Sequence, residues 1–328
     1  MNYPDIPDVT FLGDVHLGRR FIEGVPLERR GEREEAIWKQ FKDELFSNTS
    51  STHIQVGDLF DTFDVPNEVV LRAARIYKVA AHNLPGCHFY ILRGNHDASR
   101  NATKASSFDL LKALLDFVPS VSVVTEPMLT SQGFGLMPWS PFRSASVLAD
   151  DLLALRSRDV SDDFPFVVCH CDTKGWNGDD FNVIPLSKLR GFTQTVVSGH
   201  EHIPIDYKAQ GVTVHITGSM QPYSHGEDPE HTLYWTGTPD ELAALPNPEA
   251  YYLRVILQPG ETPPAIPNCL GYKVQIGAVK DDTEESDISV DFEDFDTSNV
   301  FKGILKELGV KLEIQSQVIA KFEESLNA

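Results

Sequence analysis

Short apolar runs of four or five residues recur along the first two thirds of the chain, and each ends in glycine or polar residues. Runs of this length that are rich in β-branched and aromatic side chains are typical of buried strands. The clearest candidates are residues 9–13, 53–57, 88–92, 134–137, 166–169 and 195–198. This spacing predicts a sheet-based core.

Helical periodicity separates several of these runs. Residues 66–82 begin with proline and repeat apolar side chains three and four positions apart, and residues 104–117 and 146–156 have a similar pattern. Strands that alternate with helices predict an α/β fold. Because the runs at 212–218 and 232–236 follow each other without a helix, we expect a mixed β-sandwich flanked by helices and not an all-parallel sheet.

The amino-acid composition of the chain changes after residue 238, where proline, asparagine and glutamate become frequent. We expect four parts: a large catalytic domain (1–245), a small β-rich cap (246–280), an acidic linker (281–296) and a helical segment (297–328). The linker holds nine acidic residues and neither lysine nor arginine. Such a charge run is typical of a solvated connection.

Composition narrows the class of protein. No apolar run reaches membrane-spanning length, and the first residues lack the regions of a signal peptide. The four cysteines match neither a zinc site nor a disulfide framework, so we expect them to be reduced and buried, in a cytoplasmic protein. The net charge of −20 argues against a broad electrostatic grip on nucleic acid. However, residues 1–110 carry 13 basic against 16 acidic side chains, so the acidity says little about a site there.

Five polar segments stand at the carboxyl ends of strand-like runs, the edge of an α/β sheet where ligands bind. They are Gly13-Asp14-Val15-His16, Gly57-Asp58-Leu59-Phe60-Asp61, Gly94-Asn95-His96-Asp97, His170, and Gly199-His200-Glu201-His202. Loops on a rigid sheet can bring such segments together at one site.

The residue types in these segments suit divalent metal ions. Carboxylate, imidazole and amide oxygen together suit manganese, iron or zinc. The candidate ligands are Asp14, His16, Asp58, Asn95, His170, His200 and His202. One carboxylate can bridge two ions, and Asp58 is the obvious candidate. A lone Asp-x-His pair means little, but the full ordered set is specific. Five histidines without such context are read as ordinary core or surface residues: His53, His82, His88, His215 and His231.

The ordered set D-x-H, G-D-x-x-D, G-N-H-D, H and G-H-x-H resembles the signature of calcineurin-like metallophosphoesterases, over about residues 9–236. The amino acids at residues 14–18, 57–61 and 94–97 resemble the corresponding motifs of the SbcD-type DNA nucleases. Residues 218–227 resemble that branch's G-S-x-x-R-x-S-F-G-E stretch and depart from it at Gln221, Pro222 and His225. The short length resembles phage-encoded members, for which the location would be the host cytoplasm.

The resemblance implies a role for each residue. Asp14, His16 and His202 would hold one ion, Asn95, His170 and His200 the other, and Asp58 would bridge them. His96 would not bind metal but would act on the scissile phosphate, stabilising charge or protonating the leaving oxygen. Asp97 and Asp61 could orient His96, and simple loop capping is an equally good interpretation of both.

The resulting hypothesis is a manganese-dependent DNA exonuclease or endonuclease subunit of an SbcCD-like repair and recombination complex. Residues 297–328 would bind the SbcC-type ATPase, and the nuclease would be a homodimer within the complex. Five basic residues could contact the DNA backbone, although for any single one a solvated surface is preferred: Arg19, Arg20, Arg93, Arg100 and Lys104. The alternatives are a phosphatase or small-molecule phosphodiesterase of the same fold, and a non-catalytic scaffold subunit, which would have no reason to retain seven ligands.

Overall fold

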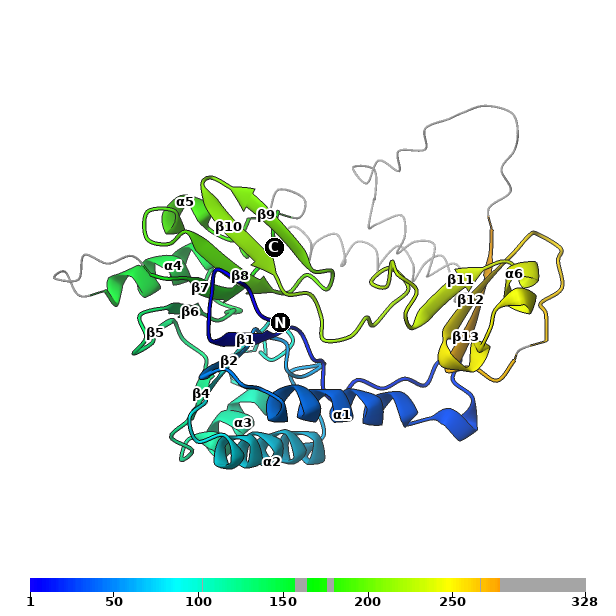
Figure 1. The fold of residues 1–328 in the computed structure, drawn as a ribbon, viewed down its shortest axis with the longest axis horizontal. Helices are drawn as coiled ribbons and strands as arrows, with labels where there is room; N and C mark the ends of the chain where they lie inside the picture. The colour runs from blue at the N-terminus through cyan, green and yellow to red at the C-terminus, as the bar shows by residue number, and fades with distance from the viewer. Residues whose placement is uncertain (102, 157–163, 176–179, 266, 278–328) are drawn as a thin grey trace, which may run out of the picture. The chain divides into compact units, whose positions relative to one another are not determined.

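The computed structural model describes residues 1–101, 103–156, 164–175, 180–265 and 267–277 (Figure 1). Residues 1–278 form the first of two units into which the chain divides. The expected acidic linker and C-terminal helical segment lie outside the described residues. No described helix combines the length and the apolar character that crossing a bilayer requires.

Two β-sheets form the centre of the first unit. One contains four parallel strands in the order β1 (Val9–Leu12), β2 (Thr52–Gln55), β3 (His88–Leu92) and β4 (Val121–Val124). The other has the order β5 (Met128–Leu129), β6 (Gly135–Met137), β7 (Val167–His170), β8 (Thr195–Gly199), β10 (Val212–Ile216) and β9 (Ile205–Ala209). In this second sheet the four inner strands are parallel, and the edge strands β5 and β9 are antiparallel to their neighbours.

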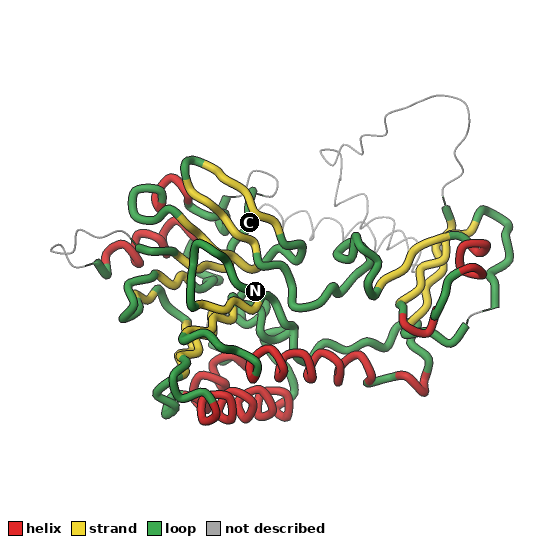
Figure 2. Tube along the Cα trace, viewed as in Figure 1, coloured by secondary structure: helices red, strands yellow, loops and turns green. Residues whose placement is uncertain are grey.

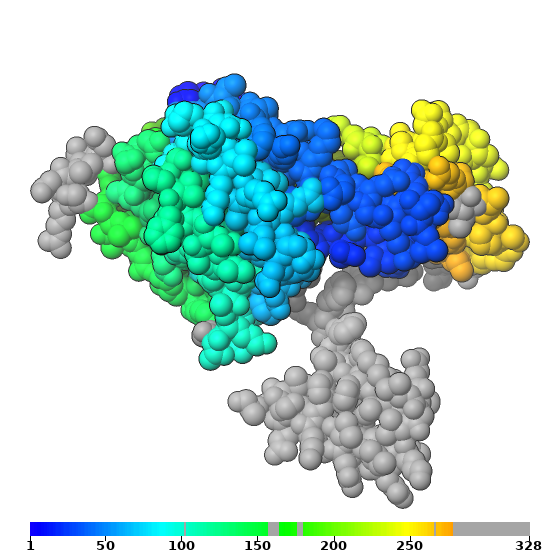
Figure 3. Space-filling view, turned by 90° about the horizontal axis from the view of Figure 1, so that it is seen from below, coloured from blue at the N-terminus to red at the C-terminus, as the bar shows by residue number. Residues whose placement is uncertain are grey.

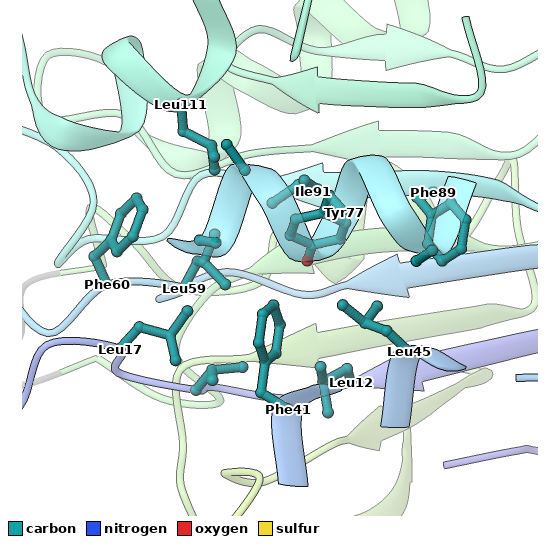
Figure 4. Close-up of a cluster of buried hydrophobic side chains, with 14 of the residues drawn as sticks. Leu12, Leu17, Phe41, Leu45, Leu59, Phe60, Tyr77, Phe89, Ile91 and Leu111 are labelled. Carbon is teal, nitrogen blue, oxygen red and sulfur yellow. The ribbon is translucent and has the colours of Figure 1, made fainter. Parts of the chain in front are cut away.

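Helices cover the outer faces of the sheets (Figure 2). The first sheet packs against α1 (Glu32–Phe46), α2 (Asn67–Asn83) and α3 (Ser107–Leu115), and the second against α4 (Ala145–Ala154) and α5 (Leu186–Leu189). Figure 4 shows Phe41 of α1 and Tyr77 of α2 in the helix-side core, with Phe89 of β3. A third apolar layer joins the sheets themselves, including Phe11 from β1 and Val168 from β7. The expected fold class, a mixed sandwich flanked by helices, is confirmed.

Helix α1 is not among the elements expected from the sequence. Its apolar residues Ile37, Trp38, Phe41 and Leu45 lie on one buried face, as the spacing of an amphipathic helix requires. Charged and polar residues separate most of these positions, so no continuous apolar run marks the segment in the sequence.

A small third sheet supplies the expected β-rich element. It contains the parallel strands β11 (Tyr234–Gly237), β12 (Tyr252–Leu257) and β13 (Gly271–Ile276). Helix α6 (Pro239–Ala244) packs its Leu242 into the core of this sheet, and two short 3₁₀ helices lie at Leu27–Arg29 and Pro248–Ala250. Strand β11 precedes residue 246, where the cap is expected to begin, so the sheet takes one strand from the range predicted for the large domain. The four domain ranges stay predictions.

Candidate metal centre

The motif segments converge at the carboxyl edges of the two large sheets. The two sheets are joined at this edge by backbone pairing between Asp14, just after β1, and Ser219, after β10. The amide of Met220 donates to the carbonyl oxygen of Asp14 at 2.8 Å. Three overlapping groups of metal-ligand side chains result, and within each group the ligand atoms lie within 4.8 Å of one another. The groups are Asp14, His16 and His202; His16, Asp58 and His96; and Asp58, His170 and His200.

The backbone is constrained at three of the candidate ligands. His16 and Asp58 have φ of 50°, and His200 has φ of 82°, all in the left-handed region that non-glycine residues seldom adopt. The amides of Val15 and His16 both donate to the carbonyl oxygen of Asp58 at 3.0 Å, which ties the first two motif loops together. Such conformations persist where the surroundings enforce them, commonly at functional sites.

Close approach explains the glycine before two of the motifs. A Cβ atom on Gly57 would lie 2.1 Å from Nδ1 of His170, and one on Gly94 would lie 2.1 Å from Oδ1 of Asp58. No side chain fits at either position without displacing a candidate ligand, so packing requires glycine at both, and at Gly57 the φ of 119° favours glycine as well.

The first group contains two imidazoles that face each other across a buried carboxylate. Nε2 of His16 lies 3.1 Å from Nε2 of His202, and the latter lies 3.6 Å from Oδ2 of Asp14. Burial lowers the pKa of His16 to about 3, so its ring is neutral at neutral pH. Glu227 lies 3.1 Å from Nδ1 of His202. Although burial raises the pKa of Glu227, hydrogen bonds from His202 and from the amide of Tyr223 bring it to about 2. The ionised Glu227 therefore holds the proton of His202 on Nδ1 and leaves Nε2 to bind.

The histidines of the third group, His170 and His200, lie on either side of the side-chain oxygen of Asn95. Oδ1 of Asn95 lies 3.0 Å from Nε2 of His170 and 2.8 Å from Nδ1 of His200. The other nitrogen of His170 donates to the carbonyl oxygen of Val56 at 3.0 Å, and that of His200 donates to Asp172 at 2.7 Å. Where each ring carries only the proton that it donates on its far side, its facing nitrogen presents a lone pair to Oδ1 of Asn95, and the three lone pairs repel one another. A cation among them would remove this repulsion.

Two buried carboxylates complete the donor set. Burial raises the pKa of Asp14 well above its ordinary value, and the nearby charge of Asp58 raises it further. Asp58 accepts a hydrogen bond from the amide of His96 at 2.8 Å, and its other oxygen lies 3.4 Å from Nε2 of His170. Buried negative charges that act on each other in this way are costly unless cations neutralise them. The residues present therefore fit divalent metal ions, and Asp58, like His16, belongs to two of the groups.

His96 lies at the exposed edge of the centre. Its Nδ1 donates to the backbone carbonyl of Asp61 at 2.6 Å, which leaves Nε2 to other contacts, and its ring meets that of His16 edge to face with the centroids 4.8 Å apart. The carboxylate of Asp61 points elsewhere, lying 3.7 Å from Nδ1 of His16 and 3.6 Å from the guanidinium of Arg19. Asp61 thus orients His96 through its backbone and not through its side chain.

Asp97 staples two motif loops. Its carboxylate accepts hydrogen bonds from the backbone amides of Leu59 at 3.2 Å, Phe60 at 2.9 Å and Gly94 at 2.9 Å. Of the two interpretations of this residue, loop capping agrees with these contacts. Burial, followed by the charge of Asp58, raises the pKa of Asp97 to about 7.

Two carboxylates that hold the histidines in place have no assigned role in the sequence analysis. Asp172 follows His170 by two residues, and Glu227 closes the 218–227 stretch. A carboxylate behind a ligating histidine is a recurrent arrangement, but only the folded loops reveal which histidine each one contacts. Asp172 contacts His200 and not the neighbouring His170.

The remaining candidates lie apart from the metal-ligand groups. None of the five histidines set aside in the sequence analysis belongs to a group found among the described residues. All four cysteines are free and buried. Of the five basic residues, Arg19 lies beside the centre, whereas the Nε of Arg93 donates to the carbonyl oxygen of Trp139 at 3.0 Å.

Comparisons with known proteins agree with this chemistry. The model of the calcineurin-like phosphoesterase family matches residues 7–204, more than half of the chain. No curated protein sequence matches the chain. A similar solved structure is that of the phosphopantetheinyl hydrolase of Mycobacterium tuberculosis, with 13% identity, a TM-score of 0.36, and coverage of 66% of this chain and 93% of that one. All seven candidate ligands fall within the matched range.

Proposed function

The chain belongs to the calcineurin-like phosphoesterase family, and we propose that it is a two-metal phosphodiesterase serving as the DNA nuclease subunit of an SbcCD-like repair and recombination complex. The family and the ligand groups together indicate a hydrolase that uses divalent metal ions. The finer proposal is supported by one observation above all. Glu227, from the stretch that resembles SbcD-type nucleases, contacts His202 in the centre itself.

In this proposal Asp14, His16 and His202 hold one ion, and Asn95, His170 and His200 hold the other. Asp58 serves both. When bound, the ions supply Lewis-acid chemistry for the hydrolysis of a phosphate ester.

The chain's own groups do the rest. Glu227 and Asp172 fix the tautomers of His202 and His200, and the carbonyl of Val56 does the same for His170. His96, held through its Nδ1, presents Nε2 to the scissile phosphate, where it stabilises charge or delivers a proton to the leaving oxygen.

Manganese is the proposed metal because four of the seven ligands are imidazoles. Magnesium prefers oxygen ligands and gives up its waters reluctantly. We expect the chelator-treated protein to cleave end-labelled DNA and bis(p-nitrophenyl) phosphate when manganese is added, and at least about tenfold more slowly with magnesium. Fast hydrolysis of p-nitrophenyl phosphate without any action on DNA would favour the phosphatase alternative.

We also propose that residues 297–328 bind an SbcC-type ATPase. Phe301, Ile304, Leu305 and Leu308 repeat at helical spacing, and an amphipathic helix of this kind commonly docks in a groove of a partner. Deleting residues 297–328 should leave manganese-dependent cleavage intact and abolish co-purification with the ATPase. A truncated chain that unfolds, or that still binds the ATPase with unchanged affinity, contradicts this assignment. The homodimer stays a prediction.

A further inference from the structure

A pocket of about 420 Å³ lies beside the metal centre, within the compact unit of residues 1–278. Its walls come from the segment that follows the first motif (residues 19–25), the loop at residues 223–225, and the three strands of the small sheet. We call it the cap pocket. None of the proposed metal ligands lines it.

Hydrogen bonds fix the walls of the cap pocket to each other. Tyr272 of β13 donates its amide proton to the carbonyl oxygen of Gly24 at 2.9 Å, and Arg29 donates to the carbonyl oxygen of Glu249 at 2.6 Å. Val25 packs against Tyr252 in a small apolar cluster. Figure 3 shows the blue residues of the N-terminal segment in contact with the yellow and orange residues of the small sheet. The segments that bound the pocket are therefore held together by hydrogen bonds and apolar contacts, and the pocket is not a gap between loose segments.

The lining of the cap pocket is positively charged in a chain whose net charge is −20. Arg19, Arg20, Arg254 and Lys273 line it, against the single acidic residue Glu23. Arg254 and Lys273 are register partners on the adjacent strands β12 and β13.

One cation of the cap pocket has an unused hydrogen-bond donor. The Nε of Arg254 is buried and has no hydrogen-bond partner among the described residues. The guanidinium of Arg254 therefore has hydrogen-bonding capacity that the described residues leave unused.

Aromatic rings form the rest of the wall and lead to the metal centre. Phe21 stacks on Tyr223 with centroids 6.5 Å apart, and the guanidinium carbon of Arg19 lies 5.0 Å from the centroid of Tyr223. On its other side, the ring of Tyr223 contacts that of His16 at 5.2 Å. The pocket is thus separated from a candidate metal ligand by one aromatic ring.

We propose that the cap pocket binds an unpaired nucleotide of the DNA strand, next to the nucleotide whose phosphate is cut. Its phosphate would be met by Arg254 and Lys273, and its base would lie against the rings and the guanidinium of Arg19. Proteins commonly hold a single strand in this way. Arginine and lysine contact the phosphates, and aromatic side chains stack on the bases. Because the cations and rings line one pocket and not an open face, a single base enters more readily than a base pair. This inference rests on the proposed nuclease function.

The test removes the two cations of the small sheet. The variant Arg254→Ala/Lys273→Ala should bind a fluorescent single-stranded oligonucleotide about tenfold or more weakly, measured by anisotropy in chelator so that metal ions play no part. The slope of log affinity against log salt should fall by about 0.7, since both cations meet one phosphate and each single-strand phosphate contact contributes about 0.7. Turnover of bis(p-nitrophenyl) phosphate with manganese should be unchanged, because so small a diester does not reach the pocket.

A charge-matched control separates the pocket from general electrostatics. Lys208→Ala/Arg190→Ala removes the same charge from exposed positions on the second sheet and at the end of α5, and it should leave affinity and salt slope unchanged. Lys273 is exposed, so Lys273→Ala alone, which should bind the oligonucleotide more weakly than the wild type, tests the pocket even if the double variant folds poorly.

The outcomes distinguish the two proposals. A wild-type protein that cleaves DNA, with pocket variants that bind it equally well and with the same salt slope, overturns the cap pocket alone. A wild-type protein that hydrolyses bis(p-nitrophenyl) phosphate but neither binds nor cuts DNA overturns the nuclease function and the pocket with it.

Discussion

Replacing Asp58 with asparagine is expected to empty both metal sites at once and to abolish hydrolysis. Asp58 belongs to two of the three ligand groups, and its side chain lies between the His16 and His170 sides of the centre. An amide keeps the shape but removes the charge that serves both ions. Outer partners of metal ligands typically contribute 10- to 100-fold in affinity, so a shared ligand should cost about 100-fold or more at each site. Elemental analysis of the purified variant measures the result directly.

His202→Ala is the matched comparison. His202 belongs to one ligand group only, so its loss should weaken one ion and leave most of the other in place. If Asp58→Asn retains two ions per chain, the bridging assignment is wrong. If both variants lose both ions equally, the two sites are not separable in the way the groups indicate.

The metal-free protein provides an independent readout of the same residue. Burial and the charge of Asp58 together raise the pKa of Asp14, so the two carboxylates oppose each other when no cation is present. In chelator, Asp58→Asn should therefore unfold at a temperature no lower than that of the wild type. With manganese added, the wild type should gain stability, because an ion that binds only the folded state stabilises it, and the variant should not.

Replacing His96 with alanine is expected to reduce DNA cleavage by about 100-fold or more while the protein remains folded and loaded with metal. The side chain is exposed at the edge of the centre, so its removal leaves no cavity in the core. His96 also falls in a group with His16 and Asp58. Metal content is therefore part of the measurement, and a loss of one ion would make His96 a ligand instead.

The leaving group separates the two catalytic roles open to His96. A p-nitrophenolate leaves without a proton, whereas the sugar oxygen of DNA needs one. If His96 is a general acid, the variant should lose far less activity on bis(p-nitrophenyl) phosphate than on DNA. If His96 only stabilises charge, the activity of the variant should fall by a similar factor on both substrates. His82→Ala, at an exposed position in the last turn of α2, is the control, and wild-type turnover in His96→Ala would remove His96 from the mechanism.

The amino-acid sequence by itself indicated the class of fold and the chemistry of the centre. Strand-like runs at 9–13 and 88–92 end in motif loops because a buried strand needs apolar side chains and a ligand must follow it at the sheet edge. Element boundaries such as β3 and α2 follow from local periodicity, which is written in neighbouring residues. Helix α1 was not predicted from the sequence because charged residues separate its apolar positions along the chain.

Contacts between distant residues were decided only by the tertiary structure. The sequence places Asp172 beside His170, yet the carboxylate contacts His200 from another strand, and Glu227 reaches His202 through a loop. Asp97 lies next to His96 in the chain but bonds to the amides of Leu59 and Phe60. Likewise, Arg254 and Lys273 form one wall of a pocket because β12 and β13 pair in a particular register. Local patterns specify which residue types follow a strand, whereas the partner of each side chain depends on how the sheets and loops pack.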